Sequence, residues 1–421
     1  MWRRYTVRGR SSQIAKRELH ETGTPRERAY LVAAGLKRPD GGGEDAVASG
    51  RWRTEASLEE LALLAKTAGA KVVGTTLQRL PAFNPKTYIG QGKLAEIVAS
   101  QGEVGYTTVI FDDELSPSQQ RNLERELDAK VLDRTALILD IFAQHARTRE
   151  GRLQVELAQL DYILPRLRGQ WSHLERMGAG IGTRGPGETQ LETDRRLIRN
   201  RISHVKKQIE KVRQQRDLHR RQRARQGIPV VSLVGYTNAG KSTLMRALSG
   251  ADVLVQDQLF ATLDPVTRRI RLPSNGTALL TDTVGFIQKL PTQLVAAFRA
   301  TLEELEEATL LLHVVDITHA DAEQQALTVD ETVRDLGLGE RPRLLALNKV
   351  DVLADEGLDP GNLELPAWAR DGLVVSAEKR WGLEELREAI EAALAEAAER
   401  KRQAAAQTRV KKQASEDREV A

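Results

Sequence analysis

Short apolar runs alternate with helix-like apolar periodicity over residues 56–150, the first long stretch of the chain with a regular pattern. The runs at 72–77 and 107–111 have the length of buried strands. Ser57 and Glu60 have the spacing of a capping box, which predicts that a helix begins at Ser57. Because strands and helices alternate, we predict a small α/β domain in this region.

The pattern between residues 151 and 227 is helical. Apolar residues recur at alternating spacings of four and three in two stretches, Leu153, Leu157, Leu160, Leu164 and Leu167, and then Ile198, Ile202, Val205, Ile209 and Val212. Such a spacing is typical of a coiled-coil seam. The two stretches are separated by residues 169–187, whose six glycines and one proline few helices could tolerate. We therefore predict an antiparallel coiled-coil hairpin with a glycine-rich basic loop at 169–187.

A second alternation of strands and helices covers residues 228–398 and predicts a larger α/β domain. Its first strand is the apolar run Val230–Val234. Residues 1–55 show little periodicity and are rich in arginine, so we predict a basic, flexible arm there. Residues 399–421 are charged and rich in alanine and glutamine, which predicts a charged tail.

The composition excludes several classes of protein. The 421 residues include no cysteine, which rules out a disulfide scaffold, a thiolate zinc site and a cysteine nucleophile. No apolar run approaches the roughly 18–20 residues that a membrane-spanning helix needs. The basic N-terminus leads into no apolar stretch and does not resemble a secretory signal. We therefore expect a cytoplasmic protein without a membrane span, and we expect a monomer.

The net charge of +4 conceals an uneven distribution along the chain. Residues 1–53 carry +6 and residues 195–225 carry +11, so the remaining residues carry −13. Thirteen basic residues on one predicted helix repel one another unless phosphate groups neutralise them. Five arginines in or beside the glycine-rich loop are the candidate contacts to a polyanion: Arg168, Arg176, Arg184, Arg195 and Arg196. A basic helix face that meets only water is the alternative.

Residues 235–242, Gly-Tyr-Thr-Asn-Ala-Gly-Lys-Ser, fit the phosphate-binding pattern G-x-x-x-x-G-K-[ST] at every defined position. A predicted strand precedes them and a predicted helix follows. Backbone N–H groups of such a loop surround phosphate oxygens, and the helix N-terminus favours negative charge. Lys241 would supply a positive charge to the outer phosphates, and the Ser242 hydroxyl would bind Mg²⁺.

Three further motifs follow in the order that is typical of a GTPase: Asp282-Thr283-Val284-Gly285, Asn348-Lys349-Val350-Asp351 and Ser376-Ala377. Asp282 would hold Mg²⁺ through water, and the Gly285 N–H would contact the terminal phosphate. The Asp351 carboxylate can accept hydrogen bonds from the N1–H and the exocyclic amine of guanine, and adenine offers neither donor at that place. The four motifs together predict a GTPase rather than an ATPase.

A threonine must complete the Mg²⁺ shell when the terminal phosphate is present. We assign this role to Thr262, within the string Phe260-Ala261-Thr262-Leu263-Asp264. Thr267 is the competitor, and it is less favoured because it lies near a strand that begins at about Arg269.

Phe286 follows Gly285, at the position where many Ras-like enzymes carry a glutamine that orients the attacking water. A phenyl ring cannot orient water, so we expect slow intrinsic hydrolysis and a partner that supplies the missing group. Asn238 would bind a K⁺ that adds positive charge near the phosphates. The alternative is that Asn238 only stabilises the loop.

We assign the catalytic roles to Lys241, Thr262 and Gly285. The predicted nucleotide-binding residues come from the four motifs and the segment around Thr262: Gly235, Tyr236, Thr237, Asn238, Ala239, Gly240, Lys241, Ser242, Thr243, Phe260, Ala261, Thr262, Leu263, Asp264, Asp282, Thr283, Val284, Gly285, Asn348, Lys349, Val350, Asp351, Ser376, Ala377 and Glu378. The predicted metal ligands are Ser242 and Thr262, with Asp282 acting through water.

A second phosphate-site candidate lies at Tyr88–Ala95, where Gly90, Gly92 and Ala95 match G-x-G-x-x-A. Asp112 and Asp113 follow a predicted strand about 20 residues further on. Formally this is a dinucleotide-binding fingerprint. The preceding strand is weak and the segment is small, which favours a tight turn into a helix. Nucleotide binding at this turn is the less favoured alternative.

The motifs of the second α/β domain, read together with two other strings, resemble those of the HflX family of ribosome-associated GTPases. The glycine-rich string from Gly180 to Arg196 resembles the signature that precedes a long helix in that family, and Phe111–Gln119 resembles its N-terminal domain. The resemblance covers about residues 56–395. It implies an α/β fold in which a Ras-like P-loop GTPase domain is joined to an N-terminal α/β domain and a long hairpin.

The resemblance also implies a function. It implies binding to the 23S rRNA of the large (50S) ribosomal subunit, splitting of stalled or idle 70S ribosomes under stress, and stimulation of GTP hydrolysis by that subunit. The loop that would approach the peptidyl-transferase region corresponds to residues 169–187. Two other functions stay open: a ribosome-assembly or RNA-modification GTPase that does not split ribosomes, and a non-catalytic RNA-binding protein in which GTP is only a structural ligand.

Overall fold

The structure is a computed structural model of the chain. It describes residues 26–37, 54–167, 186–226, 228–250, 259–260, 262–263, 265–289, 305–355 and 364–419. The predicted loop arginines Arg168, Arg176 and Arg184 and the predicted nucleotide contacts Ala261 and Asp264 lie outside these residues.

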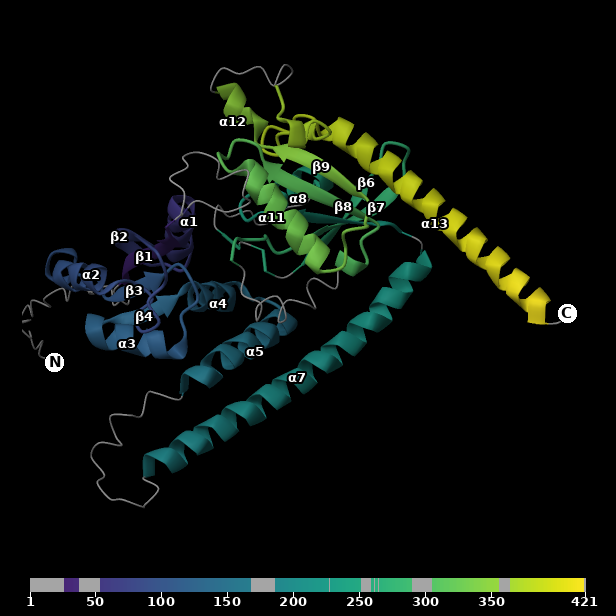
Figure 1. Cartoon of the computed structure of the whole chain (residues 1–421). Helices are drawn as coiled ribbons and strands as arrows, with labels where there is room; N and C mark the ends of the chain where they lie inside the picture. Colours follow the sequence, from purple (N-terminus) through teal and green to yellow (C-terminus); the bar gives the residue numbers. More distant parts are fainter. Residues whose placement is uncertain are drawn as a thin grey trace, which may run out of the picture.

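The N-terminal α/β domain contains a four-stranded parallel sheet with the order β2-β1-β3-β4. Its strands are β1 (Arg28–Leu36), β2 (Lys71–Leu80), β3 (Thr108–Phe111) and β4 (Lys130–Asp133). Its helices are α1 (Thr54–Thr67), α2 (Gln91–Val104), α3 (Pro117–Leu127) and α4 (Arg134–His145). Figure 1 shows this domain beside the larger one, with α1 and α4 near the contact between them.

Strand β1 corrects the prediction of a flexible arm over residues 1–55. The strand lies inside that range and occupies the centre of the sheet, between β2 and β3. Ala29, Leu31, Val32 and Ala33 are all fully buried. A central parallel strand is covered on both faces and is apolar throughout, so it lacks the alternation by which a strand is usually recognised.

Helix α1 corrects a second prediction. The helix begins at Thr54 rather than at Ser57, so Ser57 lies within its first turns. The Ser57 hydroxyl is buried and donates a hydrogen bond to Asp112 Oδ2 at 2.6 Å. Its role is therefore a long-range contact with the end of β3 and not the capping of a helix.

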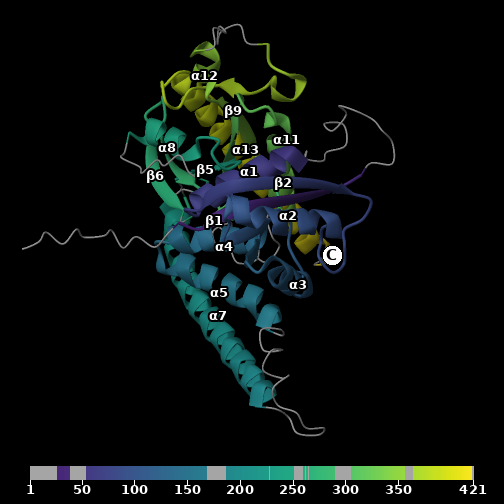
Figure 2. The same cartoon turned by 90° about the vertical axis from the view of Figure 1, so that its left-hand side faces the viewer.

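Two helices follow the N-terminal domain, α5 (Arg149–Arg166) and the 41-residue α7 (Pro186–Gln226). They lie side by side and run in opposite directions (Figures 1 and 2), and two ion pairs join them, Arg201 with Glu156 at 2.5 Å and Arg216 with Glu150 at 2.7 Å. On α7, Ile202 and Val205 of the predicted seam are buried. On α5, only Leu153 of the predicted seam is buried, beside Val155, Ala158 and Tyr162. Coiled-coil packing along the whole hairpin therefore stays a prediction.

The larger α/β domain is built on a six-stranded sheet with the order β10-β9-β8-β5-β7-β6, in which only β6 is antiparallel to its neighbour. Its strands are β5 (Val230–Gly235), β6 (Val266–Arg271), β7 (Thr277–Asp282), β8 (Leu310–Asp316), β9 (Arg343–Asn348) and β10 (Leu373–Val374). Its helices are α8 (Lys241–Ser249), α11 (Ala322–Asp335), α12 (Val350–Asp355), the short 3₁₀ helix η4 (Ala367–Ala369) and α13 (Leu383–Glu419).

Helices cover both faces of this sheet, as the apolar clusters show. Leu244 of α8 and Leu386 of α13 pack with Leu233 and Leu312 on one face. Helix α11 covers the other face (Figure 1). Helix α13 continues to Glu419, so most of the predicted tail is helical. No helix in the part of the chain that the structure describes is long and apolar enough to cross a membrane.

The two α/β domains share one apolar core. Phe142 of α4 meets Phe260 of the larger domain edge to face, with ring centroids 4.6 Å apart at an interplanar angle of 76°. Tyr236 and Phe286 belong to the same buried cluster as Phe142. The N-terminal domain therefore packs directly against the loops that follow β5 and β7.

Candidate functional site

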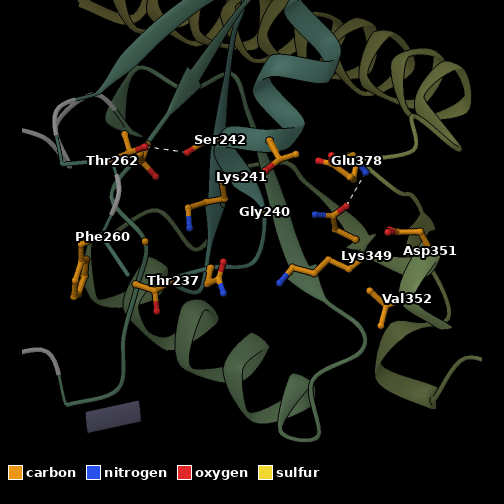
Figure 3. Close-up of a pocket in the computed structure, with 16 residues that line it drawn as sticks. Thr237, Gly240, Lys241, Ser242, Phe260, Thr262, Lys349, Asp351, Val352 and Glu378 are labelled. Atoms are coloured by element: carbon orange, nitrogen blue, oxygen red, sulfur yellow. Dashed lines mark hydrogen bonds between the residues drawn. The ribbon is translucent and has the colours of Figure 1, made fainter. Parts of the chain in front are cut away.

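A pocket opens at the carboxyl end of β5, where the loop 235–240 leads into α8 (Figure 3). Gly240 ends the loop with φ +92°, and a Cβ at this residue would lie 2.2 Å from Asn348 Nδ2. Only glycine combines this left-handed backbone with so close an approach. The loop therefore directs the N-terminus of α8 into the pocket, where backbone N–H groups and the helix dipole favour an anion.

Lys241 lies at the centre of the pocket (Figure 3). Its Nζ donates hydrogen bonds to the carbonyl oxygens of Gly235 at 3.0 Å and Tyr236 at 2.7 Å. Burial lowers the pKa of Lys241 to about 8, because an ammonium group loses hydration inside the protein. A phosphate group beside Nζ would restore the preference for the charged form.

Three oxygen-bearing side chains converge at one side of the pocket. The Ser242 hydroxyl donates to Asp282 Oδ2 at 2.6 Å and lies 2.9 Å from the Thr262 hydroxyl, which also donates to Oδ2, at 3.1 Å. The competitor Thr267 lies in β6, where its hydroxyl is 3.1 Å from that of Thr281. The geometry thus favours Thr262 over Thr267 as the threonine of this cluster.

These residues fit a magnesium ion. The donors are hydroxyl and carboxylate oxygens, which are the ligands that Mg²⁺ prefers. Asp282 Oδ1 is buried and has no hydrogen-bond partner among the described residues. Burial raises the pKa of Asp282, although the charge of Lys241 and the hydrogen bonds from Ser242 and Thr262 act in the opposite direction. A cation at Asp282 Oδ1 would compensate the negative charge of the buried carboxylate.

Gly285 lies against the loop from the other side. A Cβ at Gly285 would be 2.8 Å from Thr237 Cα and 3.0 Å from Lys241 Nζ. The next residue, Phe286, forms a short parallel bridge with the loop, in which its N–H donates to Gly235 O and its carbonyl accepts from the Thr237 N–H. The Phe286 ring is buried in the core between the domains. Its side chain therefore cannot orient a water molecule in the pocket.

Asn348 joins three segments around the pocket. Its Nδ2 donates to Ala239 O at 2.9 Å, and its Oδ1 accepts from the Ala377 N–H at 3.0 Å. One amide thus holds the loop after β5, the end of β9 and the segment after β10 at fixed distances. Beyond it, Asp351 and Glu378 line the end of the pocket that is remote from Thr262 (Figure 3).

Most of the predicted nucleotide contacts line this pocket. Those that do are Thr237, Asn238, Gly240, Lys241, Ser242, Thr243, Phe260, Thr262, Thr283, Gly285, Asn348, Lys349, Asp351, Ala377 and Glu378. Of the predicted residues that the structure describes, those that do not line the pocket are Gly235, Tyr236, Ala239, Leu263, Asp282, Val284, Val350 and Ser376. Val352 lines the pocket but was not predicted; its position directly after Asp351 was the only available signal.

The turn at Gly90 lacks the features of a dinucleotide site. The strand β2 ends at Leu80, ten residues earlier, and the Gly90 N–H donates to the Gln78 side chain at 2.9 Å. Asp112, the candidate ribose ligand, is fully buried and paired with Arg134 and Lys289. The structure therefore favours the tight turn into α2.

Of the described arginines among the predicted polyanion contacts, Arg195 and Arg196 both lie on α7, and Arg196 is exposed. The helix continues with further basic residues that the structure leaves exposed, including Arg199, Lys206, Lys207 and Lys211. These side chains give the described part of α7 a strongly basic surface.

Three protein families match the chain in succession. Residues 55–143 match the family described as "GTP-binding GTPase N-terminal", residues 145–223 match "GTP-binding GTPase Middle Region", and residues 230–349 match "50S ribosome-binding GTPase". Together they cover most of the N-terminal domain, the two helices that follow it, and the larger domain as far as the end of β9.

The chain is also similar to individual proteins. A protein named GTPase HflX from Alkalihalophilus pseudofirmus is 52% identical over 81% of this chain and 79% of the relative. GTPase HflX from Escherichia coli is 51% identical over 71% of this chain and 70% of the relative. A solved structure of a GTP-binding protein from Sulfolobus solfataricus in complex with GDP is 27% identical, with a TM-score of 0.43, and covers 88% of this chain and 99% of that chain.

Proposed function

The chain belongs to the HflX family of GTPases, and from this premise we propose that it hydrolyses GTP to GDP and phosphate, binds the large ribosomal subunit and splits stalled or idle 70S ribosomes. The observation that carries the proposal is the pocket, which places Lys241 at the N-terminus of α8 and Asp351 at the opposite end. One end suits phosphates and the other suits a guanine base, as a GTPase requires.

Each part of the pocket has a role in the proposed reaction. Lys241 and the N-terminus of α8 bind the outer phosphates, and the Gly285 N–H contacts the terminal one. Asp351 accepts hydrogen bonds from guanine, and Asn348 keeps this recognition end at a fixed distance from the phosphate loop. Ser242 and Thr262 would hold Mg²⁺ directly and Asp282 would hold it through water; when bound, the ion would neutralise charge on the phosphates. Asn238, in the left-handed region at φ 61°, would hold K⁺.

The buried Phe286 ring supports a role for the ribosome in hydrolysis. No group at this position can orient the attacking water, so the partner would supply it or would move a residue of the chain into place. The basic surface of α7, which includes Arg195 and Arg196, suits the phosphate backbone of 23S rRNA. In this scheme the GTP form binds the subunit, the N-terminal domain and hairpin compete with contacts between the subunits, and hydrolysis releases the factor into the cytoplasm.

Two measurements test this function. Purified 50S subunits are expected to raise the rate of GTP hydrolysis by at least about tenfold, because they complete a site that lacks a water-orienting group. With a non-hydrolysable GTP analogue, sucrose gradients of 70S ribosomes should show separated subunits. The 30S subunit alone is the control for the first measurement, and GDP is the control for the second.

The outcomes distinguish the candidate functions. Stimulation by 50S subunits with intact 70S particles would indicate a ribosome-assembly or RNA-modification GTPase. Binding of GTP without hydrolysis, even in the presence of 50S subunits, would indicate that GTP is only a structural ligand. The first result would contradict the proposed splitting, and the second would contradict the proposed hydrolysis of GTP.

The pKa of Lys241 predicts how nucleotide affinity depends on pH. With a pKa of about 8 in the free protein, Lys241 is mostly charged at pH 7 and mostly neutral at pH 9. Phosphates bind the charged form, so the affinity for GTP should be constant below about pH 7 and fall above pH 8, by up to about tenfold per pH unit. Titration calorimetry between pH 7 and pH 9 measures this. An affinity that does not change over this range would contradict the prediction.

A further inference from the structure

A buried ionic cluster joins the N-terminal domain to the segment that follows Gly285. Arg134, the first residue of α4, is only 1% exposed. Its guanidinium donates to Asp112 Oδ1 at 2.6 Å, to Glu60 Oε2 at 2.7 Å and to the carbonyl oxygen of Gln288 at 3.1 Å. Asp112 and Glu60 belong to the N-terminal domain, whereas Gln288 lies three residues after Gly285.

Gln288 and its neighbour Lys289 are held at further atoms. The Gln288 N–H donates to the Tyr236 hydroxyl at 2.8 Å, and Nε2 donates to the Ser57 hydroxyl at 2.5 Å. Lys289 Nζ lies 2.6 Å from both Asp112 Oδ2 and Asp113 Oδ1. We call the contacts of Gln288 and Lys289 with Arg134, Asp112, Asp113, Ser57 and Tyr236 the switch clamp.

The switch clamp lies at the carboxyl end of β3, beside the central strand β1. In open parallel sheets this edge is where ligands usually bind. Here the edge binds Lys289 of the other domain, and Asp112 is fully buried beneath it. If Lys289 moved away, the buried Asp112 carboxylate would keep only Arg134 as a cationic partner. Such a loss costs free energy because a buried charge is then less well compensated. The clamp therefore strongly restrains the position of residues 286–289.

Two other contacts connect the same domain to the pocket. Phe142 of α4 packs on Phe260, which lines the pocket near Thr262. Glu60 of α1 accepts a hydrogen bond from the hydroxyl of Tyr236, a residue of the phosphate loop. The N-terminal domain thus touches the phosphate loop and both segments that flank the terminal-phosphate end of the pocket.

We propose that Arg134 and Lys289 are positioning residues for the Gly285 N–H, so that the N-terminal domain sets how strongly the pocket prefers GTP over GDP. The inference rests on the proposed GTP binding. Gly285 is held beside Lys241 by the bridge of Phe286 to the loop and by the clamp that follows it. GDP lacks the third phosphate of GTP, which is the one that the Gly285 N–H would contact, so GDP does not use this donor. A donor that is fixed in advance binds its acceptor more tightly than a mobile one, so the clamp favours GTP selectively.

The experiment compares the dissociation constants for GDP and a non-hydrolysable GTP analogue, measured by calorimetry on the full-length protein with Mg²⁺ and without ribosomes. Lys289→Ala, whose side chain is 36% exposed in the native protein, should weaken binding of the analogue by about tenfold and leave GDP binding within about twofold. Lys289→Arg keeps the charge and should restore most of the loss. Arg134→Lys keeps the charge but loses the guanidinium that binds Asp112, Glu60 and the Gln288 carbonyl at once, and it should show the same selective loss as Lys289→Ala.

The matched control is Lys130→Ala, which removes a lysine from a half-exposed ion pair with Glu27 within the N-terminal domain. The affinities for GDP and for the GTP analogue should both stay unchanged. Unchanged GDP affinity also reports that each variant is folded. An equal affinity loss for both nucleotides in Lys289→Ala, no loss for either, or tighter analogue binding would overturn the positioning role while leaving the proposed function intact. Failure of the native protein to bind either nucleotide would overturn both.

Discussion

Replacing Lys241 with alanine is expected to weaken GTP binding by at least about 100-fold and to abolish measurable hydrolysis, with or without 50S subunits. The ammonium group is buried at the N-terminus of α8, and Lys349, the other lysine among the described residues that line the pocket, is paired with Asp316 at 2.7 Å. Charge-assisted contacts with phosphate are among the strongest hydrogen bonds in proteins. Binding of a fluorescent GTP analogue and release of phosphate measure the two effects.

The same variant should keep its fold. Burial disfavours the charged form of Lys241 and lowers its pKa, so the native protein gains little stability from this charge. The melting temperature without nucleotide should therefore stay close to that of the native protein. Arg400→Ala, on the exposed surface of α13, serves as the control for purification and handling. Tight GTP binding by Lys241→Ala would show that the pocket does not hold phosphates as proposed.

Asp351→Asn is expected to lower the affinity for GTP by about 10³-fold and to make XTP the preferred nucleotide. A carboxylate accepts hydrogen bonds from both N–H donors of guanine, and a site that is built for such donors rejects a poor match by several powers of ten. Asparagine offers one acceptor and one donor, which matches xanthine, whose second donor is replaced by a carbonyl. Competition between GTP and XTP for the pocket measures the change.

The control is Asp335→Asn at the exposed end of α11, a residue that does not line the pocket. It removes the same charge and should leave both affinities unchanged. If Asp351→Asn still preferred GTP, Asp351 would not be the residue that recognises the base, and Glu378, at the same end of the pocket, would become the candidate.

The phosphate site could be predicted from the sequence because its parts are local. The loop 235–242 contains its own glycines, lysine and serine, and the later motifs each follow a strand of the same sheet. Parallel strands place their carboxyl ends at one edge, so Asp282 and Asn348 had to lie near Lys241 once the strands were recognised. Thr262 was preferred to Thr267 because Thr267 lies near a predicted strand, and the contacts of Thr262 with Ser242 and Asp282 agree with this choice.

The contact between the domains could not be predicted, because its parts are remote in the sequence. Arg134 reaches Gln288 across 154 positions, and Ser57 reaches it across 231. Ser57 had a plausible local role as a helix cap, and nothing in its neighbours indicated the distant one. Strand β1 was missed for a related reason, since a strand that is buried on both faces has no polar face to reveal it.

Phe286 has one further consequence. Its ring fills the core between the domains and its backbone joins the phosphate loop, so a glutamine at this position would lose apolar packing without reaching the attacking water. Under the proposed function, free molecules in the cell would retain their GTP for long periods. The amount of GTP that this protein hydrolyses would then depend on the number of ribosomes to which it binds and not on its own abundance. A cell could therefore hold a large reserve of the protein while little GTP is hydrolysed.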